Sequence, residues 1–392
     1  EWQKLVGVLQ SRDSATTDAG EQEKIAQRIG EIYETKLDDA DDAIVAYNDA
    51  LSRFGPSEGT LIALARLYAG SEKWDDLLEI LEMKLERATA DDERADLHFR
   101  MAQLMRTRTG DVERAVEVYA EVLSLSPGHP GAVEALEEVI TNPNADFRVE
   151  AARTLVPFYT EQGRHGDLVG ALEVVAETDD PTEKLQALRR ASEVAEMGLE
   201  DEGQAFRLTA AAVRAALGEG NLGPMLADLE RHAVSAEKHA EHAELLETIA
   251  PDILDGELQT EALMRCALVV RTRLEDRSRA RALYQRVLDH RPEHRPALDA
   301  LEELHAEVDD HQALLDILRR KTDLADSPEA RIALLERQAQ ICEDHTGDLV
   351  AAIDAYEQVL GNQTPGPKAT KRLRRPTPKP NGGRVSPPRS SD

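Results

Sequence analysis

The sequence predicts an all-α fold, a solenoid in which antiparallel helix pairs stack one after another. The main observation is the pattern Asp-x3-Ala-x3-Tyr-x3-Leu, which recurs four times intact and once in degenerate form. The steps between the starting aspartates are 72, 90, 75 and 72 residues. Repetition at a near-fixed period is typical of small units that stack into a shared core. The copies are Asp39/Ala43/Tyr47/Leu51, Asp111/Ala115/Tyr119/Leu123, Asp201/Ala205/Thr209/Val213, Asp276/Ala280/Tyr284/Leu288 and Asp348/Ala352/Tyr356/Leu360.

Each position of this pattern has a role in a helix. The aspartate precedes an apolar run by one turn, so its carboxylate can cap the first free N–H groups. Alanine, an aromatic residue and leucine then follow at intervals of four and form one apolar stripe. The predicted structural repeat positions are Ala43, Tyr47, Leu51, Ala115, Tyr119, Leu123, Ala205, Ala280, Tyr284, Leu288, Ala352, Tyr356 and Leu360.

A second pattern alternates with the first and predicts further helices, each opened by an aromatic residue or a histidine. Its steps of 72, 91, 77 and 69 residues follow those of the first pattern. The predicted starts are Trp2, Trp74, His165, His242 and His311. One unit therefore holds four helices, for example 74–88, 92–107, 111–124 and 130–141.

The array is predicted to span residues 1–364. Its units lie near 2–72, 73–164, 165–240, 241–310 and 311–361. The second of these repeat units, 73–164, is longer than the others by about one helix. The helix that begins at Pro130 is interpreted as the additional one. A change of path is expected near 142–164, with a kink at Pro157. The alternative is a drift of repeat length without structural consequence.

Residues 109–127 resemble the second half of a tetratricopeptide repeat, a helix pair of about 34 residues. Gly110 and Asp111 match its turn, and Pro127 its closing proline. The intervening repeats depart from the family, since Leu77 stands where a small residue is expected. The resemblance implies a right-handed α-solenoid of about ten degenerate helix pairs, a bacterial-type array that binds proteins and carries no catalytic centre.

The charge is unevenly distributed along the chain. Residues 365–392 carry eight basic residues and one acidic residue, a net charge of +7, which leaves −36 of the total −29 on residues 1–364. An acidic body disfavours nucleic acid and anionic membranes and favours basic or mixed-charge partners. The Pro- and Arg-rich tail is expected to be disordered. It is a basic linker, a short nucleic-acid or membrane-surface arm, or the product of an out-of-frame reading.

No catalytic, cofactor-binding or metal-binding residues are predicted. His232, His239 and His242 lie near one helical face, but they do not form the His-Glu-x-x-His arrangement of a zinc site. Cys266 and Cys342 stand in helix stripes and are interpreted as core residues. No apolar stretch reaches the length that spans a bilayer.

The sequence therefore predicts a non-catalytic scaffold for protein–protein interaction. A peptide or a partner helix of basic or mixed charge would bind on the curved face of the array. The alternative is an accessory or regulatory segment of a larger multidomain protein, for example in signalling, secretion or motility. The chain begins at Glu1 within a repeat, so its natural start is expected upstream. A cytoplasmic location is expected.

Overall fold

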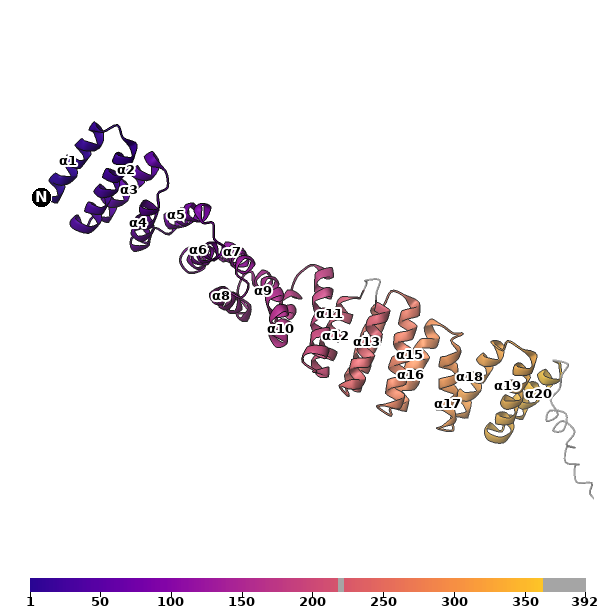
Figure 1. Ribbon diagram of the computed structural model, residues 1–392. Helices are drawn as coiled ribbons and strands as arrows, with labels where there is room; N and C mark the ends of the chain where they lie inside the picture. The colour runs from indigo at the N-terminus through magenta and orange to yellow at the C-terminus, as the bar shows by residue number, and fades with distance from the viewer. Residues whose placement is uncertain (218–221, 362–392) are drawn as a thin grey trace, which may run out of the picture. The chain divides into compact units, whose positions relative to one another are not determined.

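The computed structural model describes residues 1–217 and 222–361, and all regular elements in these ranges are helices (Figure 1). The predicted all-α fold is confirmed. The chain divides into two compact units, Glu1–Ala215 and Ala216–Asp392. The expectations for the tail 365–392 lie outside the described residues.

The first unit contains helices α1 to α12. Within it, each helix packs against the next helix along the chain, so the core extends along the stack. The helices are α1 (Trp2–Ala15), α2 (Ala19–Ile32), α3 (Ala40–Phe54), α4 (Glu58–Gly70), α5 (Trp74–Arg87), α6 (Asp91–Leu104), α7 (Val112–Leu125), α8 (Pro130–Thr141), α9 (Arg148–Gln162), α10 (His165–Val175), α11 (Pro181–Gly198) and α12 (Glu202–Ala215).

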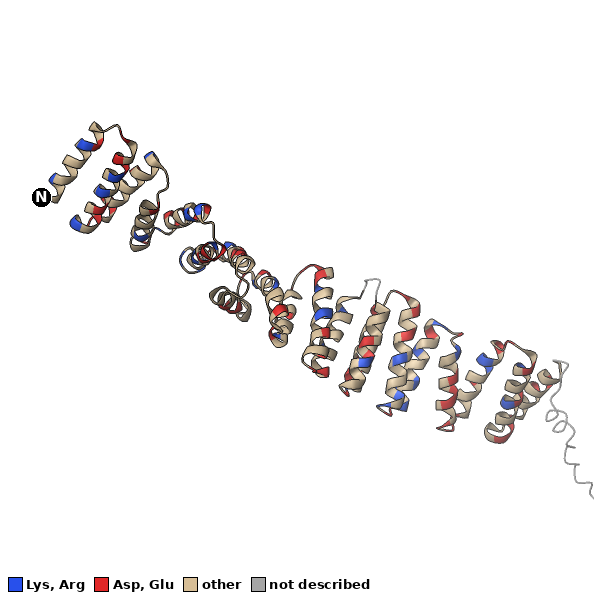
Figure 2. Cartoon of the chain, viewed as in Figure 1, with Lys and Arg blue, Asp and Glu red and all other residues tan. Residues whose placement is uncertain are grey.

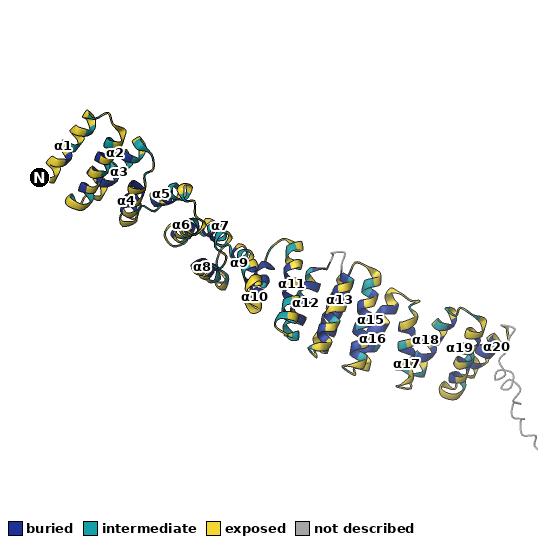
Figure 3. Ribbon diagram, viewed as in Figure 1, coloured by how far each residue is buried: buried dark blue, intermediate teal, exposed yellow. Residues whose placement is uncertain are grey.

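The second unit contains helices α13 to α20, which also pack in chain order. In both units the buried residues lie where neighbouring helices face each other (Figure 3). The helices are α13 (Leu222–Ser235), α14 (His239–Ile249), α15 (Gly256–Thr272), α16 (Arg277–His290), α17 (Arg295–Ala306), α18 (His311–Asp323), α19 (Pro328–Ile341) and α20 (Leu349–Gly361).

One turn geometry joins the helix pairs at all five copies of the aspartate pattern. The residue before each pattern aspartate adopts a left-handed conformation, with φ of 55° at Asp38 and 75° at Gly110. The N–H of Asp39 then donates to the Tyr33 carbonyl at 3.0 Å, six residues earlier. Three of these turns are short π-helices, η1 (Tyr33–Leu37), η2 (Met105–Thr109) and η4 (Cys342–Thr346), and one 3-10 helix, η3 (Ala250–Asp252), follows α14.

The pattern aspartates cap the helices that follow. The Asp39 carboxylate accepts from the Asp42 N–H at 3.1 Å, and that of Asp276 from the Arg279 N–H at 3.0 Å. This contact satisfies one of the N–H groups that a helix leaves unpaired at its start.

The predicted start of the fourth second-pattern helix at His242 is wrong. Helix α14 begins at His239, so the starts at His165, His239 and His311 are 74 and 72 residues apart. His242 occupies the position that leucine holds in the other copies, as at Leu77. Both His239 and His242 fit the second pattern in the sequence, but the helix begins at His239.

The residue before the predicted closing leucine is buried in every copy. Val122, Val287 and Val359 are each 0% exposed, whereas Leu360 is 39% exposed. A spacing of four overshoots the helical repeat of 3.6 residues, so the third step of the stripe drifts from the core. Leu360 also lies in the last described helix, where no described helix follows to cover it.

The interval between α7 and α10 holds two helices, α8 and α9, instead of one. Helix α8 begins with a His129 cap whose Nδ1 accepts from the Ala132 N–H at 3.3 Å, as His294 does at α17. Helix α9 continues through Pro157 and precedes α10 as α4 precedes α5.

Candidate binding surface

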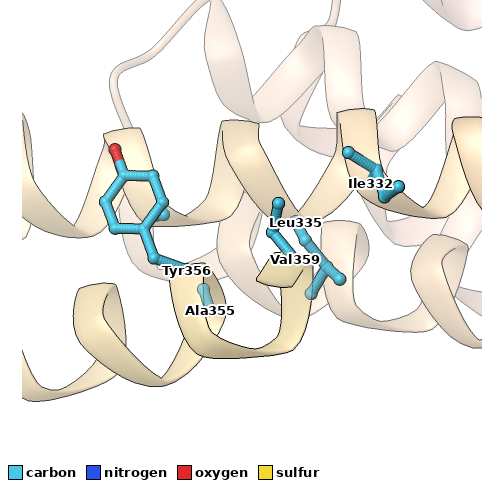
Figure 4. Close-up of a cluster of buried hydrophobic side chains, with 6 residues drawn as sticks. Ile332, Leu335, Ala355, Tyr356 and Val359 are labelled. Atoms are coloured by element: carbon cyan, nitrogen blue, oxygen red, sulfur yellow. The ribbon is translucent and has the colours of Figure 1, made fainter. Parts of the chain in front are cut away.

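The predicted repeat positions form the internal framework of the stack. Tyr119 is 1% exposed and Tyr284 2%. Burial is the main cause that raises the pKa of both phenols. Ala43, Ala115, Ala205 and Ala280 are each 0% exposed, Tyr47, Ala352, Tyr356 and Leu288 are also buried, and Leu51 and Leu123 are half-buried. Figure 4 shows the fifth copy, where Tyr356 and Val359 of α20 pack with Ile332 and Leu335 of α19.

A small residue lies seventeen positions before each pattern tyrosine, and the sequence interpretation missed it. At Gly30, an added Cβ would lie 2.8 Å from ring carbons of Tyr47. The equivalent residues before Tyr119, Tyr284 and Tyr356 are buried alanines, Ala102, Ala267 and Ala339. The tyrosine thus requires a small partner on the preceding helix, and the fixed separation was the available signal.

The degenerate third copy replaces both members of this pair. Ser192 and Thr209, which are also seventeen residues apart, share a hydrogen bond of 2.6 Å between their hydroxyl oxygens. Ser192 Oγ also lies 3.1 Å from the Ala205 carbonyl, to which it donates. Two polar residues are tolerated in this buried place because they satisfy each other.

We call the helices of the two sequence patterns second helices (α1, α3, α5, α7, α10, α12, α14, α16, α18 and α20) and the helices between them first helices. Ion pairs tie successive first helices together. Arg66 of α4 binds Glu34 through two nitrogens, and Arg271 of α15 lies 2.9 Å from Glu303 of α17. Second helices are joined in the same way, as between Glu247 of α14 and Arg279 of α16. Such exposed pairs each contribute little to stability. These pairs engage the side chains of several arginines with acidic residues. Figure 2 shows acidic residues spread over the helices of both units.

A hollow of about 240 Å³ opens between α9 and α11, two first helices, above the second helix α10. Its apolar floor includes Leu172 and Val175 of α10. Its rim is charged and polar: Arg153 binds Glu183 at 2.6 Å, and Arg190 donates to Thr160 Oγ1 at 2.8 Å. An apolar floor with a mixed-charge rim suits an aliphatic side chain flanked by charges. We call this the α9–α11 hollow.

A larger hollow, of about 420 Å³, lies between α1 and α3, above α2. Ala26 and Ile29 of α2 line it together with Val45 of α3. Arg53 bridges Asp13 and Asp49 at 2.9 and 3.0 Å across its rim. Two second helices, α1 and α3, form its walls, whereas two first helices form the walls of the α9–α11 hollow. The two hollows therefore lie on opposite sides of a helix pair.

The histidines and cysteines noted in the sequence pack against, or form hydrogen bonds with, neighbouring residues of the helices. His311 stacks on His345 with ring centroids 4.1 Å apart, in the place where Trp74 faces Arg108 at 5.1 Å. Cys266 Sγ donates to the Ala243 carbonyl, and burial raises its pKa to about 11. Within residues 1–217 and 222–361, no three histidine, cysteine or acidic side chains are grouped as metal ligands. No helix in these ranges has both the length and the apolar character needed to cross a membrane.

Comparison with known proteins gives a family match over one stretch of the chain. A family model for the tetratricopeptide repeat matches residues 60–95, which cover α4, α5 and the start of α6. This repeat is one of those that depart from the family at the small-residue position. No curated protein matches the sequence.

Three solved structures match the chain at low identity. The TPR2AB domain of yeast Sti1 in complex with pHSP90 is 14% identical, with 68% of this chain and 99% of that one covered and a TM-score of 0.25. The C-terminal part of a TPR repeat-containing protein from Cytophaga hutchinsonii is 14% identical, with coverages of 70% and 99% and a TM-score of 0.23. Naa15/Naa10 bound to HypK-THB is 12% identical, with coverages of 89% and 68% and a TM-score of 0.24.

The stacked helix pairs, the shared turn and the buried Ala–Tyr framework define a helical-repeat protein. A family model for the tetratricopeptide repeat matches the segment around α4 and α5, and the Asp-x3-Ala-x3-Tyr-x3-Leu pattern recurs in both units, so this stretch of the chain is similar to a tetratricopeptide repeat.

Proposed function

We propose that this protein is a non-catalytic scaffold that binds a peptide or a partner helix on the curved face of its helical array. A repeat array of this family supports protein–protein interaction in general. The observation that carries the specific proposal is the α9–α11 hollow, because it is lined by first helices and combines an apolar floor with a polar rim.

The partner in this proposal has basic or mixed charge. Residues 1–364 carry a net charge of −36, so the long-range field attracts cations. Near the α9–α11 hollow, the guanidinium of Arg153 lies between Glu183 and Glu150, so a partner meets both signs of charge. A segment with one leucine flanked by a lysine and a glutamate matches this rim.

The test uses three fluorescent peptides of equal length that share a central leucine. Their flanking charges are basic, acidic or mixed, and binding to the full chain is measured by fluorescence anisotropy at two salt concentrations. The basic and mixed peptides should bind, the basic one with the steeper loss at high salt because its attraction is screened. Tight binding of the acidic peptide alone would contradict the proposal.

A variant localises the binding. Gln186 is an exposed residue that lines the hollow, so Gln186→Trp should fill it and weaken the mixed peptide by about tenfold, or 1.4 kcal/mol. The matched control is Ala333→Trp, an exposed position at the equivalent place on α19. Equal affinities of the two variants would remove the hollow from the binding surface.

The second candidate function is an accessory or regulatory segment of a larger protein, with a cytoplasmic location. In that case the array spaces or regulates another domain instead of recruiting a free peptide. Binding by the isolated chain, as in the experiment above, favours the scaffold.

A further inference from the structure

A recurring ion pair joins second helices that pack on the same first helix. A glutamate stands eight residues after the start of three second-pattern helices, and an arginine of the next second helix lies within ion-pair distance of it. The pairs are Glu82–Arg114, Glu173–Arg207 and Glu247–Arg279, with shortest N–O distances of 3.9, 2.6 and 2.7 Å. Each pair bridges the groove above a first helix, namely α6, α11 or α15.

The second helices α1 and α3 lack this bridge. Gln10 stands where three other helices have glutamate, and Asp42 stands where α7 and α16 have arginine. The pair α18 and α20 also differs, with Arg319 and Ala351 at these positions, so α1–α3 is the pair in which a carboxylate takes the place of the arginine. Gln10 and Asp42 both line the hollow of about 420 Å³. Every lining residue lies between positions 10 and 53, and we call this site the α1–α3 hollow.

The rim of the α1–α3 hollow is acidic. It carries the carboxylates of Asp13, Asp42 and Asp49 and one basic side chain, Arg53. The Arg53 guanidinium donates to both oxygens of Asp13 at 2.9 and 3.2 Å and to Asp49 at 3.0 Å. The carboxylate of Asp42 is exposed and has no basic partner among residues 1–217 and 222–361. One carboxylate of the hollow is therefore available to a cation from outside.

The floor of the α1–α3 hollow is apolar. Ala26 and Ile29 of α2 are 5% and 8% exposed, and Val45 of α3 is 66% exposed beside them. Tyr33 also lines the hollow, and an aromatic face attracts a cation. An arginine side chain suits this combination, because its stem covers apolar surface while its planar guanidinium matches a carboxylate. Arg53 shows that a guanidinium fits between carboxylates of α1 and α3.

We propose that the α1–α3 hollow binds an arginine side chain of a partner polypeptide. The guanidinium lies between the Asp42 carboxylate and the side-chain oxygen of Gln10, and the stem lies on Ile29 and Val45. The partner thus supplies the arginine that the chain itself supplies in the α5–α7 and α14–α16 grooves. This site is independent of the α9–α11 hollow, since it uses other helices and the opposite side of a helix pair.

The probes are three capped peptides of the form Gly-Ala-X-Ala-Gly, in which X is arginine, lysine or citrulline. Citrulline keeps the shape of arginine, but its side chain carries no charge. Binding to the full chain is followed by methyl NMR, in which Ile29 and Val45 report on the hollow. The arginine peptide should shift these signals until they saturate, the lysine peptide should bind more weakly, and the citrulline peptide should not bind. Binding of either other peptide as tight as that of the arginine peptide would refute the recognition of a guanidinium.

Two variants close the hollow in different ways. Gln10→Glu combined with Asp42→Arg installs the ion pair of the other grooves and should weaken the arginine peptide at least about tenfold. Val45→Trp fills the hollow without a change of charge and should have the same effect. The matched control is Asp41→Asn, which changes the net charge as the double variant does but does not line the hollow, so it should bind like the parent. All these residues are exposed, so the variants should keep the parent circular dichroism spectrum.

Three outcomes would overturn the assignment. Parent-like affinity of the double variant or of Val45→Trp would exclude the hollow as the site. Gln186→Trp should leave binding unchanged, and a loss there would place the peptide in the α9–α11 hollow. If the peptide binds only after residues 365–392 are deleted, and binding still depends on Asp42, the tail of the chain is the occupant and a partner is not.

Discussion

Replacing His242 by leucine should stabilise the second unit, and more strongly at acidic pH. His242 is 1% exposed, and its Nε2 has no hydrogen-bond partner among the described residues. Burial lowers its pKa from 6.5 to about 4, with repulsion from Arg265 and His239 as smaller causes. Leucine occupies the equivalent position in α5, α10 and α18, so the packing of this repeat accommodates a leucine side chain at that place.

The sign and size follow from proton linkage. The folded state keeps His242 neutral down to about pH 4, whereas the unfolded chain takes up a proton below pH 6.5. The stability of the parent is therefore highest above pH 6.5 and falls as the pH is lowered toward 4. A free energy of 1.36 kcal/mol per pKa unit gives a loss of about 2 kcal/mol between pH 8 and pH 5. His242→Leu removes this loss.

Hydrogen exchange of residues 239–272 at pH 8 and pH 5, corrected for the intrinsic rates, measures the effect within the second unit. Urea unfolding followed by circular dichroism supports it. The difference in stability between variant and parent should grow by about 2 kcal/mol at the lower pH. The exposed His290 provides the control, since His290→Leu removes a histidine without changing the core. A difference that is the same at both pH values would refute the assignment of His242 as a buried neutral residue.

Three further predictions concern the framework and the tail. Gly30→Ala should cost about 1–3 kcal/mol in urea unfolding, because its Cβ would lie 2.8 Å from the Tyr47 ring, whereas Gly59→Ala meets no atom within 4 Å and should stabilise α4 slightly. Ala115→Trp should cost at least about 1–3 kcal/mol by overpacking, and a melting temperature equal to that of the parent would contradict the stacking. Deleting residues 365–392 should strengthen binding of a basic peptide at low salt, if the +7 tail competes for the acidic helices. Unchanged affinity at every salt concentration would exclude that competition.

The helices could be predicted because the sequence repeats their caps and stripes. The predicted helices 92–107 and 111–124 lie close to α6 with η2 and to α7, and the pattern aspartates are in place as caps. A single sequence read by a strict spacing of four could not assign the last step of the stripe, since the true repeat alternates between three and four. The start of α14 was missed because a histidine replaces the buried leucine that would have marked the register.

The hollows and the Ser192–Thr209 pair could not be predicted in the same way. A hydrogen bond between residues seventeen apart depends on how two helices face each other, and the pattern shows only that Thr209 replaces a tyrosine. The volume of the α9–α11 hollow depends on the sizes of side chains from three helices. A period within one helix does not predict how side chains from three helices pack together. The repeated helix caps and apolar stripes can be predicted from the sequence, whereas features that differ from one repeat to the next depend on how the helices pack.

The pair α8 and α9 clarifies what a first helix does in this array. Several first helices contact the second helix on each side of them, as α4 contacts α3 and α5 and α17 contacts α16 and α18. Here α8 packs on α7 and on α9, whereas α9 packs mainly on α10 and makes a smaller contact with α7. Two helices therefore share, in this interval, the contacts that one first helix makes in the other pairs.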